Sequence, residues 1–129
     1  MYLELIYSYL LLSDIRYVGV DSNKNWNDAK QNCIENGGRL MEIRTQEEYE
    51  TALQSRVVLN GYKFWIGGSD IEVEGNWVWD SNQEGVILNE FWVSGSPLNT
   101  REKTCLAMSS SGMVDASCSV LRRSVCEFN

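Results

Sequence analysis

The stretch FWIGGSDIEVEGNWVW, residues 64–79, decides the fold of this 129-residue chain. Its first five residues are apolar or glycine, which is typical of a short buried strand that ends at a glycine. Its last three residues, Trp77, Val78 and Trp79, predict a second strand, and Glu74-Gly75-Asn76 before them has the composition of a turn. The stretch therefore predicts two short strands joined by an acidic turn, with its tryptophans in the core.

The residues before this stretch predict two helices. Asn25 is a favourable N-cap for a helix that ends at Gly37-Gly38. Thr45, followed by Glu48 three residues later, has the pattern of a capping box and starts the second helix. The apolar face of that second helix consists of Tyr49, Ala52, Leu53 and Val57.

The remaining segments predict further strands and one long loop. Residues 14–20, 106–108 and 123–128 each predict a short strand. Residues 80–103 are rich in Ser, Asn and Gly and show little periodicity, and loops of that length inside a compact domain are usually functional. The fold class is therefore α+β, with two helices, short antiparallel strands and a long loop region.

The first twelve residues are apolar and alternate as a strand would. We expect residues 1–16 to form a strand extension of a domain that spans residues 17–129. The segment fits a signal peptide poorly, since it has no basic start and Glu4 interrupts it, although a leader remnant is the alternative. It is too short to span a bilayer. Because it is apolar on both faces, we expect it to pair with its copy in a homodimer; the alternative is that it covers its own domain's edge.

Composition excludes several functions. A net charge of −7 opposes binding to nucleic acid or to an anionic membrane. The chain has no His, which removes the commonest general base and the commonest transition-metal ligand. A carboxylate pair such as Glu47 and Glu48 lies at adjacent helix positions that point in different directions. We therefore expect a protein that is not an enzyme.

The chain has four cysteines, which are Cys33, Cys105, Cys118 and Cys126. No CxxC pair occurs, so no familiar zinc spacing is present. An even number in a small loop-rich chain indicates disulfides and a secreted, extracellular protein, with free buried thiols as the alternative. Spacing alone leaves three connectivities open.

In their order, these motifs resemble the C-type lectin-like domain family, a fold used for recognition. The matching residues are Trp26–Ala29 with Cys33, Gly38–Ile43, Phe64–Gly68, Glu74–Trp79, Phe91-Trp92 before Pro97, Gly112–Asp115 before Cys118, and Val125–Glu127. The resemblance covers about residues 17–128 and no single stretch carries it. It implies the short form of the domain, with disulfides Cys33–Cys126 and Cys105–Cys118.

The calcium and sugar site that the resemblance implies is largely missing. In sugar-binding members, the long loop holds calcium through oxygen ligands, as this cation requires. Ser96-Pro97-Leu98 stands where those members have Glu/Gln-Pro-Asn/Asp. Lys103 stands at the family's acidic position before Cys105, or Glu102 does, because the spacing from Pro97 to Cys105 is about one residue shorter than is common in the family. The family's last ligands are the Asn-Asp of a Trp-Asn-Asp strand, which reads Met113-Val114-Asp115 here, so only Asp115 remains. We therefore expect no calcium cofactor.

A second calcium site of the family is matched in part by Asp70 and Glu74. Further along the chain, Asn99 and Thr104 stand where the family has its other ligands for this site, so the ligand set is incomplete. The alternative is that both carboxylates cap a turn. They are therefore weak metal candidates.

The expected function is carbohydrate binding, with a glycan or glycoprotein as partner, through a loop surface without the usual calcium chemistry. The residues assigned to this surface are Ser96, Asn99, Arg101, Lys103 and Asp115. The Lys103 ammonium could take the place of the cation and donate to sugar hydroxyls, or it is a solvated lysine beside an acidic neighbour. The alternative function is a calcium-independent protein-recognition module that uses the same loop.

Overall fold

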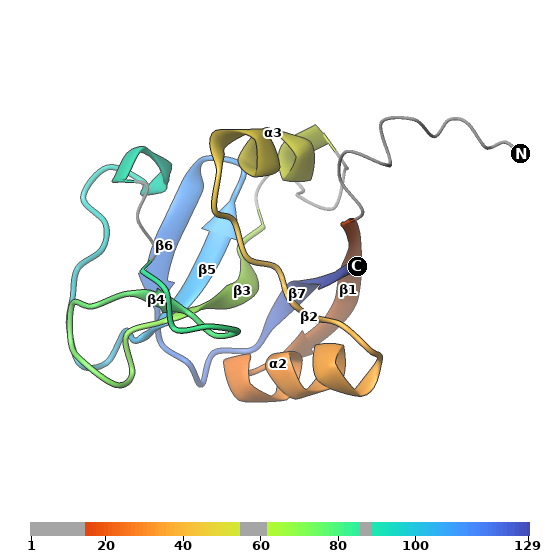
Figure 1. Cartoon of the computed structure of the whole chain (residues 1–129). Coiled ribbons are helices and arrows are strands. Elements are labelled where there is room, and N and C mark those ends of the chain that lie inside the picture. The colour runs from red at the N-terminus through yellow and green to blue at the C-terminus, as the bar shows by residue number, and fades with distance from the viewer. Residues whose placement is uncertain (1–14, 55–61, 86–88) are drawn as a thin grey trace, which may run out of the picture.

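The computed structural model describes residues 15–54, 62–85 and 89–129, and its elements form a single sheet flanked by two helices (Figure 1). The expected strand in residues 1–12 and the expected core position of Val57 lie outside the described residues. The elements are β1 (Arg16–Lys24), α2 (Trp26–Glu35), β2 (Arg39–Leu40), α3 (Gln46–Gln54), β3 (Phe64–Ser69), β4 (Val78–Trp79), the 3-10 helix η1 (Asn89–Phe91), β5 (Cys105–Ser109), β6 (Gly112–Ala116) and β7 (Arg122–Phe128).

The strand order is β1-β7-β3-β5-β6, with β2 paired to β7 and β4 to β3. The expected α+β fold is confirmed, but not every pairing is antiparallel as expected. β3 and β7 run parallel, with Phe64 opposite Arg123 and Trp65 opposite Ser124. The last strand, β7, lies between β1 and β3; it runs antiparallel to β1 and in the same direction as β3.

Both helices begin where their capping residues predict. The Asn25 side chain accepts a hydrogen bond from the Asp28 amide at 2.8 Å at the start of α2. The Thr45 hydroxyl accepts one from the Glu48 amide at 3.0 Å at the start of α3. The Glu48 carboxylate accepts from the Arg44 amide at 2.7 Å instead of from Thr45, so the capping box is displaced by one residue.

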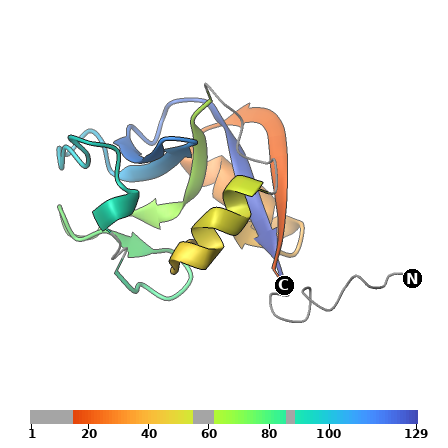
Figure 2. The same cartoon turned by 90° about the horizontal axis from the view of Figure 1, so that it is seen from above.

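The core has two parts because successive residues of a strand point to opposite faces of the sheet. In β3, Phe64 and Ile66 pack in a cluster with Ala52 of α3, whereas Trp65 packs with Trp26 of α2. Figure 2 shows the two helices on different sides of the strands. The tryptophans at 65, 77 and 79 are buried, as expected.

Two disulfides join distant segments, and they confirm the implied pairing. Cys33 of α2 is bonded to Cys126 of β7 with Cα atoms 5.5 Å apart, across a sequence separation of 93. Cys105 of β5 is bonded to Cys118 with Cα atoms 5.2 Å apart. A cross-link that closes so long a loop stabilises the fold by roughly 4–5 kcal/mol in the loop-entropy treatment.

Across residues 15–54, 62–85 and 89–129, neither helix combines the length and the apolar character of a bilayer span.

Candidate functional site

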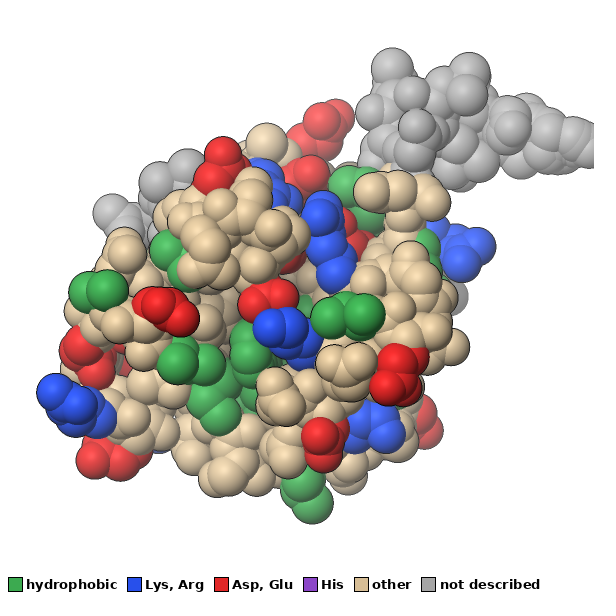
Figure 3. All heavy atoms as spheres, turned by 60° about the horizontal axis from the view of Figure 1, so that its bottom comes forward, with side chains coloured by type: hydrophobic (Ala, Val, Ile, Leu, Met, Phe, Trp, Pro, Cys, Tyr) green, Lys and Arg blue, Asp and Glu red, His purple; other side chains and the backbone are tan. Residues whose placement is uncertain are grey.

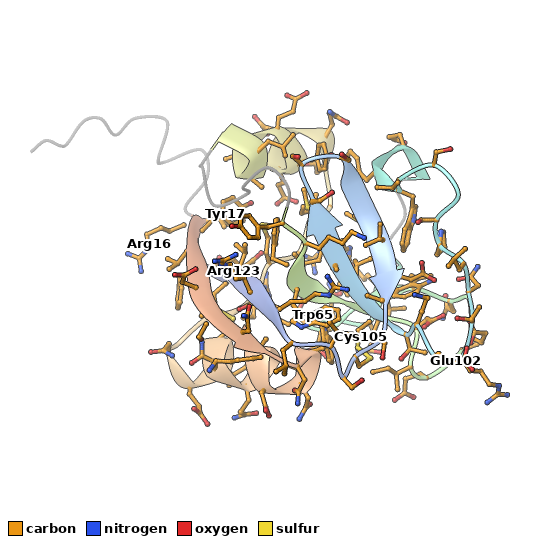
Figure 4. All side chains as sticks on the ribbon, turned by 180° about the vertical axis from the view of Figure 1, so that it is seen from behind. Arg16, Tyr17, Trp65, Glu102, Cys105 and Arg123 are labelled. Atoms are coloured by element: carbon orange, nitrogen blue, oxygen red, sulfur yellow. A yellow bond between two sulfur atoms is a disulfide. The ribbon has the colours of Figure 1, made fainter. Side chains whose placement is uncertain are left out.

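The long loop leaves β4 and returns to the sheet at β5. It lies on the far side of the molecule from β1, and Figure 4 shows Glu102 on it, across the molecule from Arg16. Most of its described residues are polar and exposed. The loop is therefore a surface that two elements, β4 and β5, present to solvent.

Asp115 fixes the middle of this loop to the sheet. It lies on β6 with only 5% of its surface exposed. One oxygen of its carboxylate, Oδ2, accepts hydrogen bonds from the Leu98 amide at 2.7 Å and from the Asn99 amide at 3.0 Å. Hydrogen bonds to an ionised group are the strong ones in proteins, so this contact orders the loop.

Asn99 makes a second attachment. Its side-chain oxygen accepts a hydrogen bond from the Trp77 indole nitrogen at 2.9 Å. Trp77 is itself buried and meets Trp92 edge to face, with ring centroids 5.4 Å apart. Asn99 has a φ of 56°, a left-handed conformation that asparagine tolerates better than most residues. Through its edge-to-face contact with Trp77, Trp92 packs against the core, as expected.

The other expected contact residues differ in exposure. Arg101 is exposed, while Ser96 and Lys103 are half-buried. The Lys103 amide donates to the Thr100 carbonyl at 3.0 Å, which closes a turn at the loop's outer end. The structure brings Asn99 and Asp115 into contact through the loop backbone.

The acidic turn between β3 and β4 lies beside the loop. Asp70 is 1% exposed; its Oδ2 accepts from the Gly75 amide at 2.8 Å, and its own amide donates to the Thr104 carbonyl at 3.1 Å. Asp70 thus caps the turn, as its alternative assignment predicts. The pKa of Glu74 is raised, first by desolvation and second by the neighbouring Asp70 carboxylate. The positive charge of Arg101 offsets part of this increase. In the described part of the chain, no three Asp, Glu, His or Cys side chains gather as metal ligands would.

Three exposed apolar side chains at this end of the molecule were not anticipated. Ile71 and Val73 of the turn are 56% and 57% exposed, and Leu98 of the loop is 58% exposed. The turn and the loop are joined by the hydrogen bond from Asp70 to Thr104. The alternation of apolar and acidic residues at 70–74 was the available signal.

Two buried glutamates were likewise not anticipated. Glu42 and Glu127 are 1% and 2% exposed. The Glu127 carboxylate accepts from the Glu42 amide at 2.8 Å and from the Arg39 guanidinium at 2.9 Å. Burial raises the pKa of Glu127, against the lowering effects of these two donors. In the sequence, Glu42 and Glu127 each stand between apolar residues. That placement was the sequence signal for buried carboxylates, which need a cationic partner.

Known proteins similar to this chain share its family and its fold. The model of the Lectin C-type domain family matches residues 22–128. A C-type lectin domain family 4 member M from Symphalangus syndactylus is 32% identical over 112 residues, which are 86% of this chain and 26% of that protein. The CD209 antigen of Homo sapiens is 30% identical over 112 residues, 86% of this chain and 28% of the antigen. The chain thus spans about a quarter of the length of these relatives.

Solved structures give the same fold. The mouse scavenger receptor C-type lectin carbohydrate-recognition domain has a TM-score of 0.79 at 25% identity, over 89% of this chain and 88% of that one. A calcium-independent type II antifreeze protein has a TM-score of 0.75 at 24% identity, over 88% and 85%. The family match covers β2 to β7, the end of β1, both helices, both disulfides and the long loop. This chain therefore belongs to the Lectin C-type domain family.

Proposed function

We propose that this domain is a carbohydrate-binding lectin whose long-loop surface recognises sugar without calcium. Membership of the lectin family supports carbohydrate as the ligand class. The mouse scavenger receptor C-type lectin domain, a carbohydrate-recognition domain of the same fold, gives the same support. The calcium independence rests on one observation, the binding of the Asp115 carboxylate to the loop's own backbone.

Two backbone amide hydrogens lie against the Asp115 carboxylate, where a bound cation would otherwise lie. Calcium takes six to eight oxygen ligands. Two amide groups point their positive ends at the Asp115 oxygen, from Leu98 and Asn99. The side-chain oxygen of Asn99 is occupied by Trp77, and Leu98 has no side-chain oxygen. The residues present therefore do not fit a calcium cage, and a loop ordered by Asp115 has no need of one.

The side chains that remain available to contact a sugar are mainly hydrogen-bond donors. Arg101 is an exposed residue, and Lys103 and Ser96 are half-buried residues. Guanidinium and ammonium groups donate to sugar hydroxyl and acetamido oxygens. Because the loop backbone is already ordered, a ligand would lose less of its binding free energy to ordering the site.

A glycan array, probed with and without a calcium chelator, tests this proposal. We expect the same glycans to bind in both conditions. Changing Arg101→Gln together with Lys103→Gln should abolish that binding. The matched control, Arg16→Gln with Lys30→Gln, removes the same charge from β1 and α2 and should retain it. Binding only in calcium would contradict the proposed mechanism.

Protein recognition is the second candidate, and the exposed apolar residues favour it. Ile71 and Val73 of the acidic turn and Leu98 of the long loop are each more than half exposed, and exposed apolar surface is a common feature of protein interfaces. No binding on the array, together with a protein ligand lost in Leu98→Ser, would transfer the function to this candidate.

The proposal also includes an extracellular location and assembly into a dimer. Disulfides persist in oxidising compartments, so the two bridges support an extracellular location. Among the described strands, β1 is one edge of the sheet and β6 is the other. An edge strand invites pairing with another chain, and a two-fold dimer would give a weak sugar site avidity.

A further inference from the structure

A row of three cations, Lys24, Lys63 and Arg122, crosses the sheet from β1 over β7 to the residue that precedes β3. Lys24 of β1 is the register partner of Arg122 of β7. On the other side of β7, Phe64 is opposite Arg123 in parallel register. Lys63 directly precedes Phe64 and Arg122 directly precedes Arg123, so continuing this register by one residue sets Lys63 next to Arg122. Neighbouring strands lie about 4.8 Å apart, so the three residues span about 10 Å across adjacent strands.

The middle cation of the row is held on an aromatic ring. The Arg122 guanidinium carbon lies 5.3 Å from the centroid of the Trp65 ring. The Trp65 indole nitrogen in turn donates to the Lys24 carbonyl at 2.9 Å, so the ring ties two members of the row together. The Arg122 Nε is buried, and no group in the described residues accepts its hydrogen. Burial also lowers the pKa of Arg122, as expected for a cation without a counter-ion.

The three residues of the row have no acidic partner in an ion pair, and among the other described basic residues Arg16, Arg101 and Lys103 have none either. The remaining four are ion-paired, in the pairs Lys30–Asp80, Arg39–Glu127, Arg44–Glu42 and Arg123–Asp21. Lys24, Lys63 and Arg122 form no ion pair with any described residue. Asp28 and Glu35 line a shallow groove with Lys24, without pairing with it.

An unpaired row of cations is unexpected in a chain whose net charge is −7. Neighbouring like charges repel, and an anion laid across them would relieve that repulsion. At physiological salt, charges act over about 8 Å, so a ligand at the row responds to these cations more than to distant carboxylates. We propose that this row binds a sulfated polysaccharide, at a site separate from the long loop.

The shape and charge of the surroundings favour a single chain over an anionic membrane. Figure 3 shows acidic and basic side chains intermixed on the face that carries α2, without a broad basic area. A flat anionic bilayer would contact the carboxylates on this face together with the row. A polysaccharide chain would cross the row and leave most of the acidic surface uncovered.

Binding to immobilised dextran sulfate, with uncharged dextran as the matched polymer, tests the proposal. We expect binding to dextran sulfate alone, and weaker binding as salt rises, as for other polyanions. Changing Lys24→Gln with Lys63→Gln should reduce affinity about tenfold, since two of three contacts lose their charge. Arg122 stays in place, so the packing on Trp65 is kept.

The loop variant Arg101→Gln with Lys103→Gln carries the same net charge and serves as the control. It should bind dextran sulfate as the unmodified protein does, whereas the row variant should keep any neutral-glycan binding of the loop. Equal losses in both variants would overturn the proposal, because overall charge would then explain the binding. Binding to phosphatidylserine vesicles but not to dextran sulfate would overturn it in favour of a membrane. Circular dichroism melts would verify that both variants are folded.

Discussion

Asp115 and Leu98 are joined by a hydrogen bond of 2.7 Å, from the Leu98 amide to the buried carboxylate. This bond connects β6 to a loop residue 17 positions earlier in the chain. Asn99 adds a second amide to the same oxygen. The acidic residue that the family resemblance assigns to a metal is therefore used here by the backbone.

Removing this carboxylate should loosen the loop. We expect Asp115→Ala to lower the free energy of unfolding by about 2–3 kcal/mol, because two amides lose a charged acceptor. The matched control is Asp80→Ala, which breaks the half-exposed pair with Lys30 and should cost less than about 1 kcal/mol. Urea unfolding of both variants measures the difference, and equal losses would mean that Asp115 does not order the loop.

Calcium should leave the stability of the domain almost unchanged. A ligand that binds only the native state raises the melting temperature by mass action. Since Oδ2 of Asp115 and the side-chain oxygen of Asn99 already accept hydrogen bonds from the protein, calcium has too few ligands to do this. Thermal melts in millimolar calcium and in chelator provide the measurement. A reversible rise of several degrees with calcium would show that a site exists.

The stability of the fold should depend on pH through Glu127. Its pKa is raised in the folded state by burial, so the native state holds the proton more readily than the unfolded chain does. That contribution is fully present below the unfolded pKa of about 4.3 and is lost as pH rises through the folded pKa. The free energy of unfolding of the unmodified protein, minus that of Glu127→Gln, should therefore fall over this interval.

Melts of both proteins between about pH 3 and pH 7 give this difference. Glu47→Gln, which removes an exposed carboxylate from α3, is the control and should give a flatter curve. A difference that grows with pH would mean that the Arg39 ion pair outweighs the effect of burial at Glu127.

The N-terminal residues should control assembly. We expect the full chain to be a dimer at micromolar concentration and a variant without residues 1–13 to be a monomer, because the segment precedes the edge strand β1. Light scattering measures both masses. A monomeric full chain would support the alternative that the segment covers its own edge, and a dimeric truncated chain would place the interface elsewhere.

Much of the fold could be predicted because its signals are local. Asn25 and Thr45 start helices by bonding to amides three residues away, and residues 64–66 alternate between two faces of one strand. The cysteine pairing came from family resemblance, since spacing alone allows three connectivities. The parallel pairing of β3 with β7 was missed, because it depends on where the last strand inserts.

The sequence by itself determined the composition of the loop, including the loss of oxygen ligands at Ser96, Leu98 and Lys103. Only the tertiary structure decided what Asp115 and Asn99 do, because their partners are a backbone and an indole brought close by the sheet. The row of Lys24, Lys63 and Arg122 is likewise a product of strand register. Residues far apart in the chain become neighbours only when strands pair, and no local pattern encodes that proximity.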